Sequence, residues 1–220
     1  MIKAVLFDLD GTLTDTLSTI AHFGNCALGK FGFPPIPTER YRYLVGDGRD
    51  LLIHRMLAEH GADTAENYQN VGIAYDTAYE ADVLHGTVPY DGIPELLTNL
   101  QENGLKTAVL SNKPHNVTKM VVQAVFGNRF DIVYGQRPGY PMKPDPAVAR
   151  MVAEELGVSP AECTFVGDTS VDIATGKNAG MLPIGVLWGF RDAAELRRAG
   201  AAHIVKKPQE LLQILADKRK

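Results

Sequence analysis

Two aspartates stand two residues apart, directly after an apolar run near the start of the chain. The run covers residues 4–7, and Asp8, Asp10 and Gly11 follow it. A buried strand that ends on two carboxylates concentrates negative charge where folding alone disfavours it. A hard divalent cation would neutralise that charge, and an aspartate held there could attack a phosphorus atom. The pair therefore predicts metal-assisted nucleophilic chemistry.

Polar or charged residues follow three further segments of the chain in the same way. They are Ser111 with Asn112, Lys143, and Asp168 with Asp172. Each of these sites alone is weak support for catalysis, because serine and aspartate are common in turns after any strand. The four sites together, all at the carboxyl ends of predicted strands, form a much more specific pattern.

The elements that must position these residues alternate from residue 83 onward. The predicted strands cover residues 106–110, 131–134, 164–166, 184–187 and 203–205, and predicted helices cover residues 93–103, 117–126 and 146–156. Strands that are apolar throughout and separated by helices are typical of a parallel sheet covered on both faces. The predicted fold class is therefore α/β, with a Rossmann-like parallel sheet core and helices on both faces.

Residues 16–82 interrupt this alternation, because they contain helical patterns and no convincing strand. The expected helices cover residues 16–31, 38–44, 49–60 and 66–80. We expect this insert to form an all-helical cap domain over the carboxyl ends of the strands, where open α/β sheets bind ligands. The predicted domains are a catalytic α/β core of residues 1–15 and 83–220, and a helical cap of residues 16–82.

Composition and charge exclude several other classes of protein. The chain has 220 residues, of which 45% are hydrophobic, and this composition is typical of a globular protein. Its net charge of −4 gives no indication of a nucleic-acid or anionic-membrane partner. Met1 leads directly into a predicted strand, without a signal sequence or a long apolar span, which favours a cytoplasmic location. Two cysteines are too few for a disulfide framework or a zinc cluster. No feature of the sequence indicates an oligomeric state.

The order of the motifs resembles that of the haloacid dehalogenase superfamily of hydrolases. The matching stretches are Asp8-Leu9-Asp10-Gly11-Thr12, Ser111-Asn112, Lys143-Pro144-Asp145-Pro146 and Gly167-Asp168 with Asp172. The insert after the first strand resembles the helical cap of the phosphoglycolate phosphatase-like branch. Residues 44–48 and 185–190 also resemble sequences of that branch. The resemblance implies a phosphatase that uses Mg²⁺ and acts on a small phosphorylated metabolite, for instance 2-phosphoglycolate.

The resemblance also implies catalytic and metal-binding roles for single residues. Asp8 would be the nucleophile, Asp10 the general acid and base, and Lys143 a fixed positive charge beside Asp8 and the phosphate. The metal ligands would be the side chains of Asp8 and Asp168 and the backbone carbonyl of Asp10. Asp172 lies one helical turn beyond Asp168 and would orient waters on the metal.

Substrate binding is predicted for four residues. Ser111 and the Asn112 amide would hold phosphoryl oxygens at the start of a helix, and Thr12 belongs to the same first motif as the nucleophile. Arg49 follows a glycine-rich turn at the start of a cap helix and would face a substrate carboxylate. An alternative for that turn, equally consistent with the sequence, is a helix N-cap by Asp47.

Three other residues have simpler interpretations. A surface position is favoured for Lys113, with substrate binding as the alternative. Tyr75 and Tyr79 stand four residues apart on a predicted helix, and we expect them to pack.

Other functions remain open on the same core. A sugar-phosphate mutase, a pyrophosphatase and a nucleotidase would all share its residues. A dehalogenase is not expected to carry both Asp10 and Asp168, and a phosphonate hydrolase would need a suitable cap lysine, where the insert has only Lys30. A non-catalytic protein that binds a phosphorylated ligand is a different class, and the presence of Asp8 disfavours it.

Overall fold

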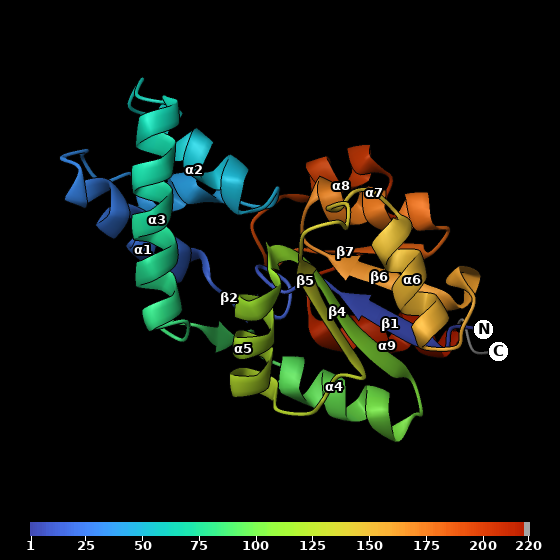
Figure 1. Cartoon of the computed structure of the whole chain (residues 1–220). Helices are drawn as coiled ribbons and strands as arrows, with labels where there is room; N and C mark the ends of the chain where they lie inside the picture. Colours follow the sequence, from blue (N-terminus) through green and yellow to red (C-terminus); the bar gives the residue numbers. More distant parts are fainter. Residues whose placement is uncertain (218–220) are drawn as a thin grey trace.

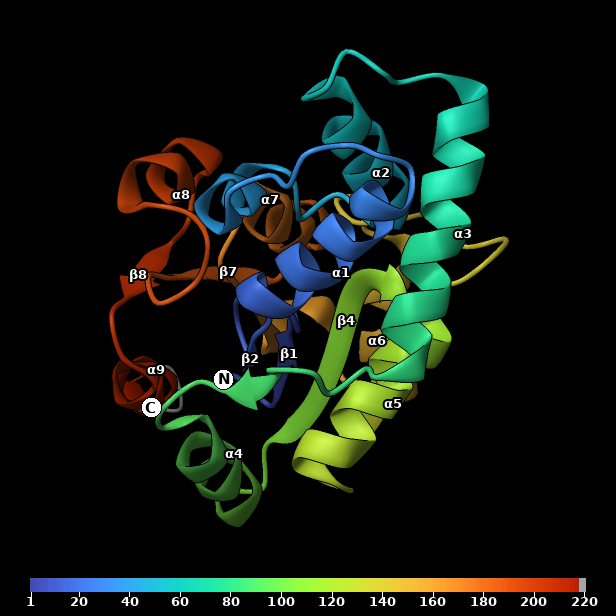
Figure 2. The same ribbon diagram turned by 90° about the vertical axis from the view of Figure 1, so that its left-hand side faces the viewer.

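Six parallel strands form the main sheet of the protein, for which a computed structural model describes residues 1–217. Their spatial order is β5-β4-β1-β6-β7-β8; Figure 1 labels the first five of these strands and Figure 2 labels β8. The strands are β1 (Ala4–Phe7), β4 (Lys106–Pro114), β5 (Ile132–Gln136), β6 (Cys163–Gly167), β7 (Leu182–Val186) and β8 (His203–Val205). The predicted fold class is confirmed. The last three residues of the predicted core, 218–220, lie outside the described part of the chain.

Strand β1 shows why these segments form a parallel sheet covered on both faces. Successive side chains of a strand point to opposite faces. Val5 and Phe7 accordingly pack into one apolar cluster, and Ala4 and Leu6 pack into another. All four side chains are buried, so the strand is apolar throughout rather than alternating.

Helices cover each face of the sheet. Helices α4 (Ile93–Glu102), α5 (His115–Phe126) and α9 (Pro208–Asp217) pack on the face of Val5 and Phe7. Helices α6 (Ala147–Glu155) and α7 (Ser170–Ala179) pack on the opposite face, with α8 (Ala193–Ala199) beside α7. A short 3₁₀ helix, Pro160–Glu162, leads into β6.

Residues 17–81 contain three α-helices and a 3₁₀ helix that stand together beyond one end of the sheet. They are α1 (Leu17–Lys30), the 3₁₀ helix Thr38–Tyr43, α2 (Arg49–Ala58) and α3 (Ala65–Ala81). Figure 2 faces this segment, with its helices in front of the strands. The predicted helices of this segment are present, except that residues 38–43 form a 3₁₀ helix instead of an α-helix.

Two features of the strands differ from the prediction. The chain connects the sheet to the helical segment twice, and the two connections pair as a small antiparallel sheet. Its strands are β2 (Thr14–Asp15) and β3 (Val88–Pro89). Such short strands leave no periodic pattern in a sequence. Strand β4 continues to Pro114, four residues beyond the predicted end, through a register shift after Leu110.

Within residues 1–217, none of the helices has the combination of length and apolarity that a membrane span needs.

Candidate active site

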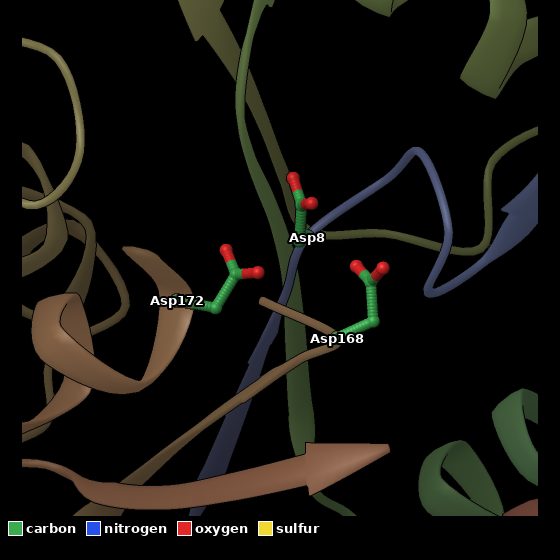
Figure 3. A group of neighbouring side chains, drawn as sticks. All are labelled: Asp8, Asp168 and Asp172. Atoms are coloured by element: carbon green, nitrogen blue, oxygen red, sulfur yellow. The ribbon is translucent and has the colours of Figure 1, made fainter. Parts of the chain in front are cut away.

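Three carboxylates meet at one edge of the sheet. Asp8 follows β1, Asp168 follows the neighbouring strand β6, and Asp172 lies in the first turn of α7. One carboxylate oxygen from each lies within 4.8 Å of the others, and all three side chains are buried. In Figure 3 the three carboxylates, from three different elements, face a shared space. The parallel register of β1 and β6 brings them together, because both strands end at the same edge.

Lys143 supplies a positive charge to this cluster. Its Nζ donates to Asp8 Oδ1 at 2.8 Å and to Asp172 Oδ1 at 2.7 Å. Its backbone is fixed by Asn112, whose Oδ1 accepts from the Lys143 amide at 2.9 Å and whose Nδ2 donates to the Lys143 carbonyl at 3.1 Å. The Asn112 side chain therefore holds the lysine loop against the end of β4.

The cluster contains more buried negative charge than one lysine neutralises. Burial raises the pKa of Asp8 to about 7, and the nearby Asp172 carboxylate adds to the rise, although Lys143 opposes it. Burial also raises the pKa of Asp168 well above its usual range. For Lys143, burial is outweighed by the carboxylates of Asp172 and Asp8, which raise its pKa and keep it charged. A hard divalent cation with oxygen ligands fits this excess of charge and this set of donors.

Neighbouring groups fix the orientation of Asp168. Thr12 donates its hydroxyl to Asp168 Oδ1 at 3.1 Å, and the Phe190 amide donates to Oδ2 at 2.8 Å. Gly11 has a φ of +85°, and a Cβ at this position would lie 2.5 Å from Asp168 Oδ2. Only glycine therefore allows the loop after Asp8 to approach Asp168 so closely. The Thr12 side chain, predicted to bind substrate, is fully buried against Asp168.

Asp172 is held by the start of its own helix. Its Oδ2 accepts from the amide and the hydroxyl of Thr169, at 3.0 and 2.7 Å. This is a capping arrangement, and it leaves Oδ1 for Lys143.

Asp10 points toward the helical segment, and its carboxylate accepts hydrogen bonds from two side chains. Thr16 donates to Asp10 Oδ1 at 2.8 Å, and Lys113 Nζ lies 3.1 and 3.0 Å from the two carboxylate oxygens. Lys113 Nζ also donates to the Tyr79 hydroxyl of α3 at 2.8 Å. Lys113 is buried, so the favoured surface position was wrong. Tyr79 is buried as expected, and in addition it links α3 to this edge of the sheet.

A cavity of about 390 Å³ lies between this edge of the sheet and helices α1–α3. Asp8, Asp10, Ser111 and Asn112 line it from the edge of the sheet, and Arg49 lines it from the helices. The structure thus brings these predicted site residues around one space. Asp168, Asp172 and Lys143 surround Asp8 as described above.

Arg49 is already paired with acidic neighbours. Its guanidinium donates to both carboxylate oxygens of Asp76, at 3.0 and 2.7 Å, and to Asp50 at 3.0 Å. The N-cap role considered for Asp47 was wrong: Asp47 accepts from Arg55 at 2.6 Å, and Gly48 is the N-cap residue of α2.

Comparison with known proteins identifies the class to which this fold and site belong. The family model of the haloacid dehalogenase-like hydrolases matches residues 2–180. The chain belongs to this family, which confirms the resemblance seen in its motifs.

Individual relatives are phosphatases. The chain is 32% identical over 220 residues to a phosphoglycolate phosphatase of Pseudomonas putida, covering 98% of this chain and 80% of that protein. It is 30% identical to an N-acetylmuramic acid 6-phosphate phosphatase of Pseudomonas aeruginosa, covering 97% and 95%. A crystal structure from Lactobacillus delbrueckii subsp. bulgaricus, of a protein provisionally named a phosphoglycolate phosphatase, superposes with a TM-score of 0.91 at 30% identity and covers 95% of this chain and 96% of that one. The chain is accordingly a phosphatase of the phosphoglycolate phosphatase-like branch.

Proposed function

We propose that the protein is a Mg²⁺-dependent phosphomonoester hydrolase that works through an aspartyl-phosphate on Asp8. The observation that carries the proposal is the buried cluster of Asp8, Asp168 and Asp172 around the single cation of Lys143. The substrate is a small phosphorylated metabolite. The names of the relatives suggest two candidates of different size, 2-phosphoglycolate and a sugar phosphate.

In the first step a carboxylate oxygen of Asp8 attacks phosphorus, and the bond from phosphorus to the ester oxygen breaks. Asp10 lies two residues further along the same loop and lines the same cavity, so it can give a proton to the leaving alkoxide. In the second step Asp10 takes a proton from water as the water attacks phosphorus. Inorganic phosphate leaves, and the Asp8 carboxylate is restored.

Positive charge must offset the repulsion between the Asp8 carboxylate and an anionic phosphate. Lys143 supplies one charge, held 2.8 Å from Asp8. Asp8, Asp168 and the backbone carbonyl of Asp10 would hold Mg²⁺, with Asp172 orienting its waters. The bound ion would add charge that stabilises the phosphoryl oxygens. Ser111 and the Asn112 amide would bind those oxygens at the end of β4.

We further propose that residues 16–82 act as a cap over a core of residues 1–15 and 83–220. Two hydrogen bonds support the cap. Lys113 Nζ donates to the Tyr79 hydroxyl, and Asn112 Nδ2 donates to the Gly46 carbonyl at 3.3 Å. Both join the helical segment to the end of β4. A cap in this position would shield the aspartyl-phosphate from bulk water.

The metal requirement gives the first test. Treatment with a chelator should lower phosphate release from p-nitrophenyl phosphate by about 100-fold or more, and added Mg²⁺ should restore it. Mg²⁺ should also raise the thermal midpoint of the protein without substrate, because it binds the folded carboxylate cluster. Full activity in the chelator would contradict the assignment.

Asp10→Asn tests the general acid. The phosphorylation step should slow by about 10²–10⁴-fold for esters with alkoxide leaving groups, and much less for p-nitrophenyl phosphate, whose leaving group needs no proton. Single-turnover rates separate this step from the second one. Asp91→Asn, at an exposed position, is the matched control. Equal losses for both kinds of ester would exclude Asp10 as the acid.

A further inference from the structure

Apolar side chains from four helices line part of this cavity. Its apolar lining comes from Ile20 of α1, Leu52 of α2, Tyr75 of α3 and Val117 of α5. Tyr75 also lies against Tyr79, with ring centroids 5.6 Å apart. Apolar and aromatic side chains of this kind bury the carbon frame of a ligand.

Among the described residues, two cationic side chains line this cavity, Arg49 and Lys113. Both are already bonded to other groups of the protein. Arg49 uses four N–H···O bonds on Asp76, Asp50 and the Tyr68 hydroxyl. Lys113 is bonded to Asp10 and Tyr79. A second acidic group of a substrate would therefore have to displace an internal carboxylate to reach a positive charge.

Helix α3 provides the space that the Arg49 side chain occupies. The guanidinium lies across Gly72, where a Cβ would collide with Nη2. Any side chain at position 72 would push Arg49 off the helix and away from Asp76, one turn further along. The pairing of Arg49 with Asp76 is thus a property of the fold.

The remaining charges of the helical wall are negative. Asp76 and Glu80 both line the cavity, and they stand four residues apart on α3. Arg49 carries one positive charge against the carboxylates of Asp76 and Asp50. Together with Glu80 this leaves a net negative charge at the wall, which repels a carboxylate and can accept hydrogen bonds from hydroxyl groups.

We infer that the preferred substrate is the phosphate ester of an uncharged, ring-sized alcohol, and not of a short acid such as glycolate. The inference rests on the proposed function and adds the identity of the leaving alcohol. A cavity of about 390 Å³ is large enough for a ring beside the phosphate. A two-carbon acid would leave the apolar wall unfilled and would place its carboxylate beside Asp76 and Glu80.

Four synthetic esters separate size from charge. They are 2-hydroxyethyl phosphate, 2-phosphoglycolate, benzyl phosphate and 4-carboxybenzyl phosphate, all with alkoxide leaving groups. We expect kcat/KM to be about tenfold higher or more for each neutral ester than for its carboxylate partner. We also expect benzyl phosphate to exceed 2-hydroxyethyl phosphate by at least a similar factor. A preference for 2-phosphoglycolate over 2-hydroxyethyl phosphate would overturn the inference, as would a preference for the smaller neutral ester over the ring.

Asp76→Asn tests the charge argument directly. The variant removes one of the two carboxylates paired with Arg49, so the ratio of kcat/KM for 4-carboxybenzyl phosphate to that for benzyl phosphate should rise about tenfold. Asp63→Asn is the matched control, because Asp63 pairs with His54 in the same helical segment and does not line the cavity. The control should keep the wild-type ratio. An unchanged ratio in a folded Asp76→Asn protein would refute the role of the pair.

Failure of the proposed function would look different. If the protein hydrolyses p-nitrophenyl phosphate with Mg²⁺ but prefers the carboxylate esters, only the inference about the alcohol fails. If it hydrolyses neither p-nitrophenyl phosphate nor any of the four esters, the proposed function fails, and the inference fails with it.

Discussion

Asp8→Asn should abolish phosphate release and leave the fold intact. We expect kcat to fall by about 10⁴-fold or more, because an amide is a poor nucleophile and Asp8 is the group that would form the covalent intermediate. The amide has the shape of the carboxylate, and its oxygen can still accept from Lys143. The substitution removes a carboxyl whose own pKa is raised by burial, and it removes one of the like charges that raise the pKa of Asp168, so stability should not fall.

Phosphate release from p-nitrophenyl phosphate and a thermal melt of the same sample measure both effects. Asp91→Asn serves again as the control, since it makes the same chemical change at an exposed position. Retained turnover by a folded Asp8→Asn protein would disprove the nucleophile assignment. Loss of turnover together with loss of the folded state would be uninformative about chemistry, and the isosteric change is chosen to avoid it.

Lys143→Met should remove both activity and stability. Methionine fills much of the space of the lysine stem but leaves the buried carboxylates of Asp8 and Asp172 without their cation. Breaking a buried ion pair by removing one partner costs about 3–5 kcal/mol. Activity should fall by about 10³-fold, because the fixed positive charge beside the nucleophile is lost.

Urea unfolding and phosphate release measure these two losses. Lys3→Met is the matched control: Lys3 pairs with Glu162 at the surface, its side chain is 54% exposed, and its loss should cost about 1 kcal/mol or less. Mg²⁺ should stabilise the Lys143→Met protein more than it stabilises the wild type, because the bound ion replaces part of the missing charge. Wild-type stability in Lys143→Met would contradict the charge balance described for the cluster.

Local sequence patterns were sufficient to predict the sheet and the place of the acidic cluster. Apolar runs separated by helices predict parallel strands, and parallel strands end at one edge, so Asp8 and Asp168 had to lie at the same edge of the sheet. Asp172 followed from the helical spacing after Asp168. These relations depend on the chain direction and on residues only a few positions apart.

Contacts between distant elements could not be predicted in this way. Lys113 was expected at the surface, and the strand before it was predicted to end at residue 110. In the structure β4 continues to Pro114, and the lysine meets Tyr79, which belongs to a helix of the other segment. Arg49 was likewise predicted to face a substrate, and its pairing with Asp76 depends on how α2 packs against α3.

Trapping the covalent intermediate tests the central claim most directly. The Asp10→Asn protein, mixed with p-nitrophenyl phosphate and Mg²⁺, should form the intermediate and then hydrolyse it slowly. Acid quenching, digestion and fragment mass spectrometry locate the phosphoryl group. We predict one phosphoryl group on Asp8, absent when Asp8→Asn is combined with Asp10→Asn. A phosphoryl group on any other residue, or complete single turnover without a phosphoryl group on Asp8 at any time point, would contradict the proposed mechanism.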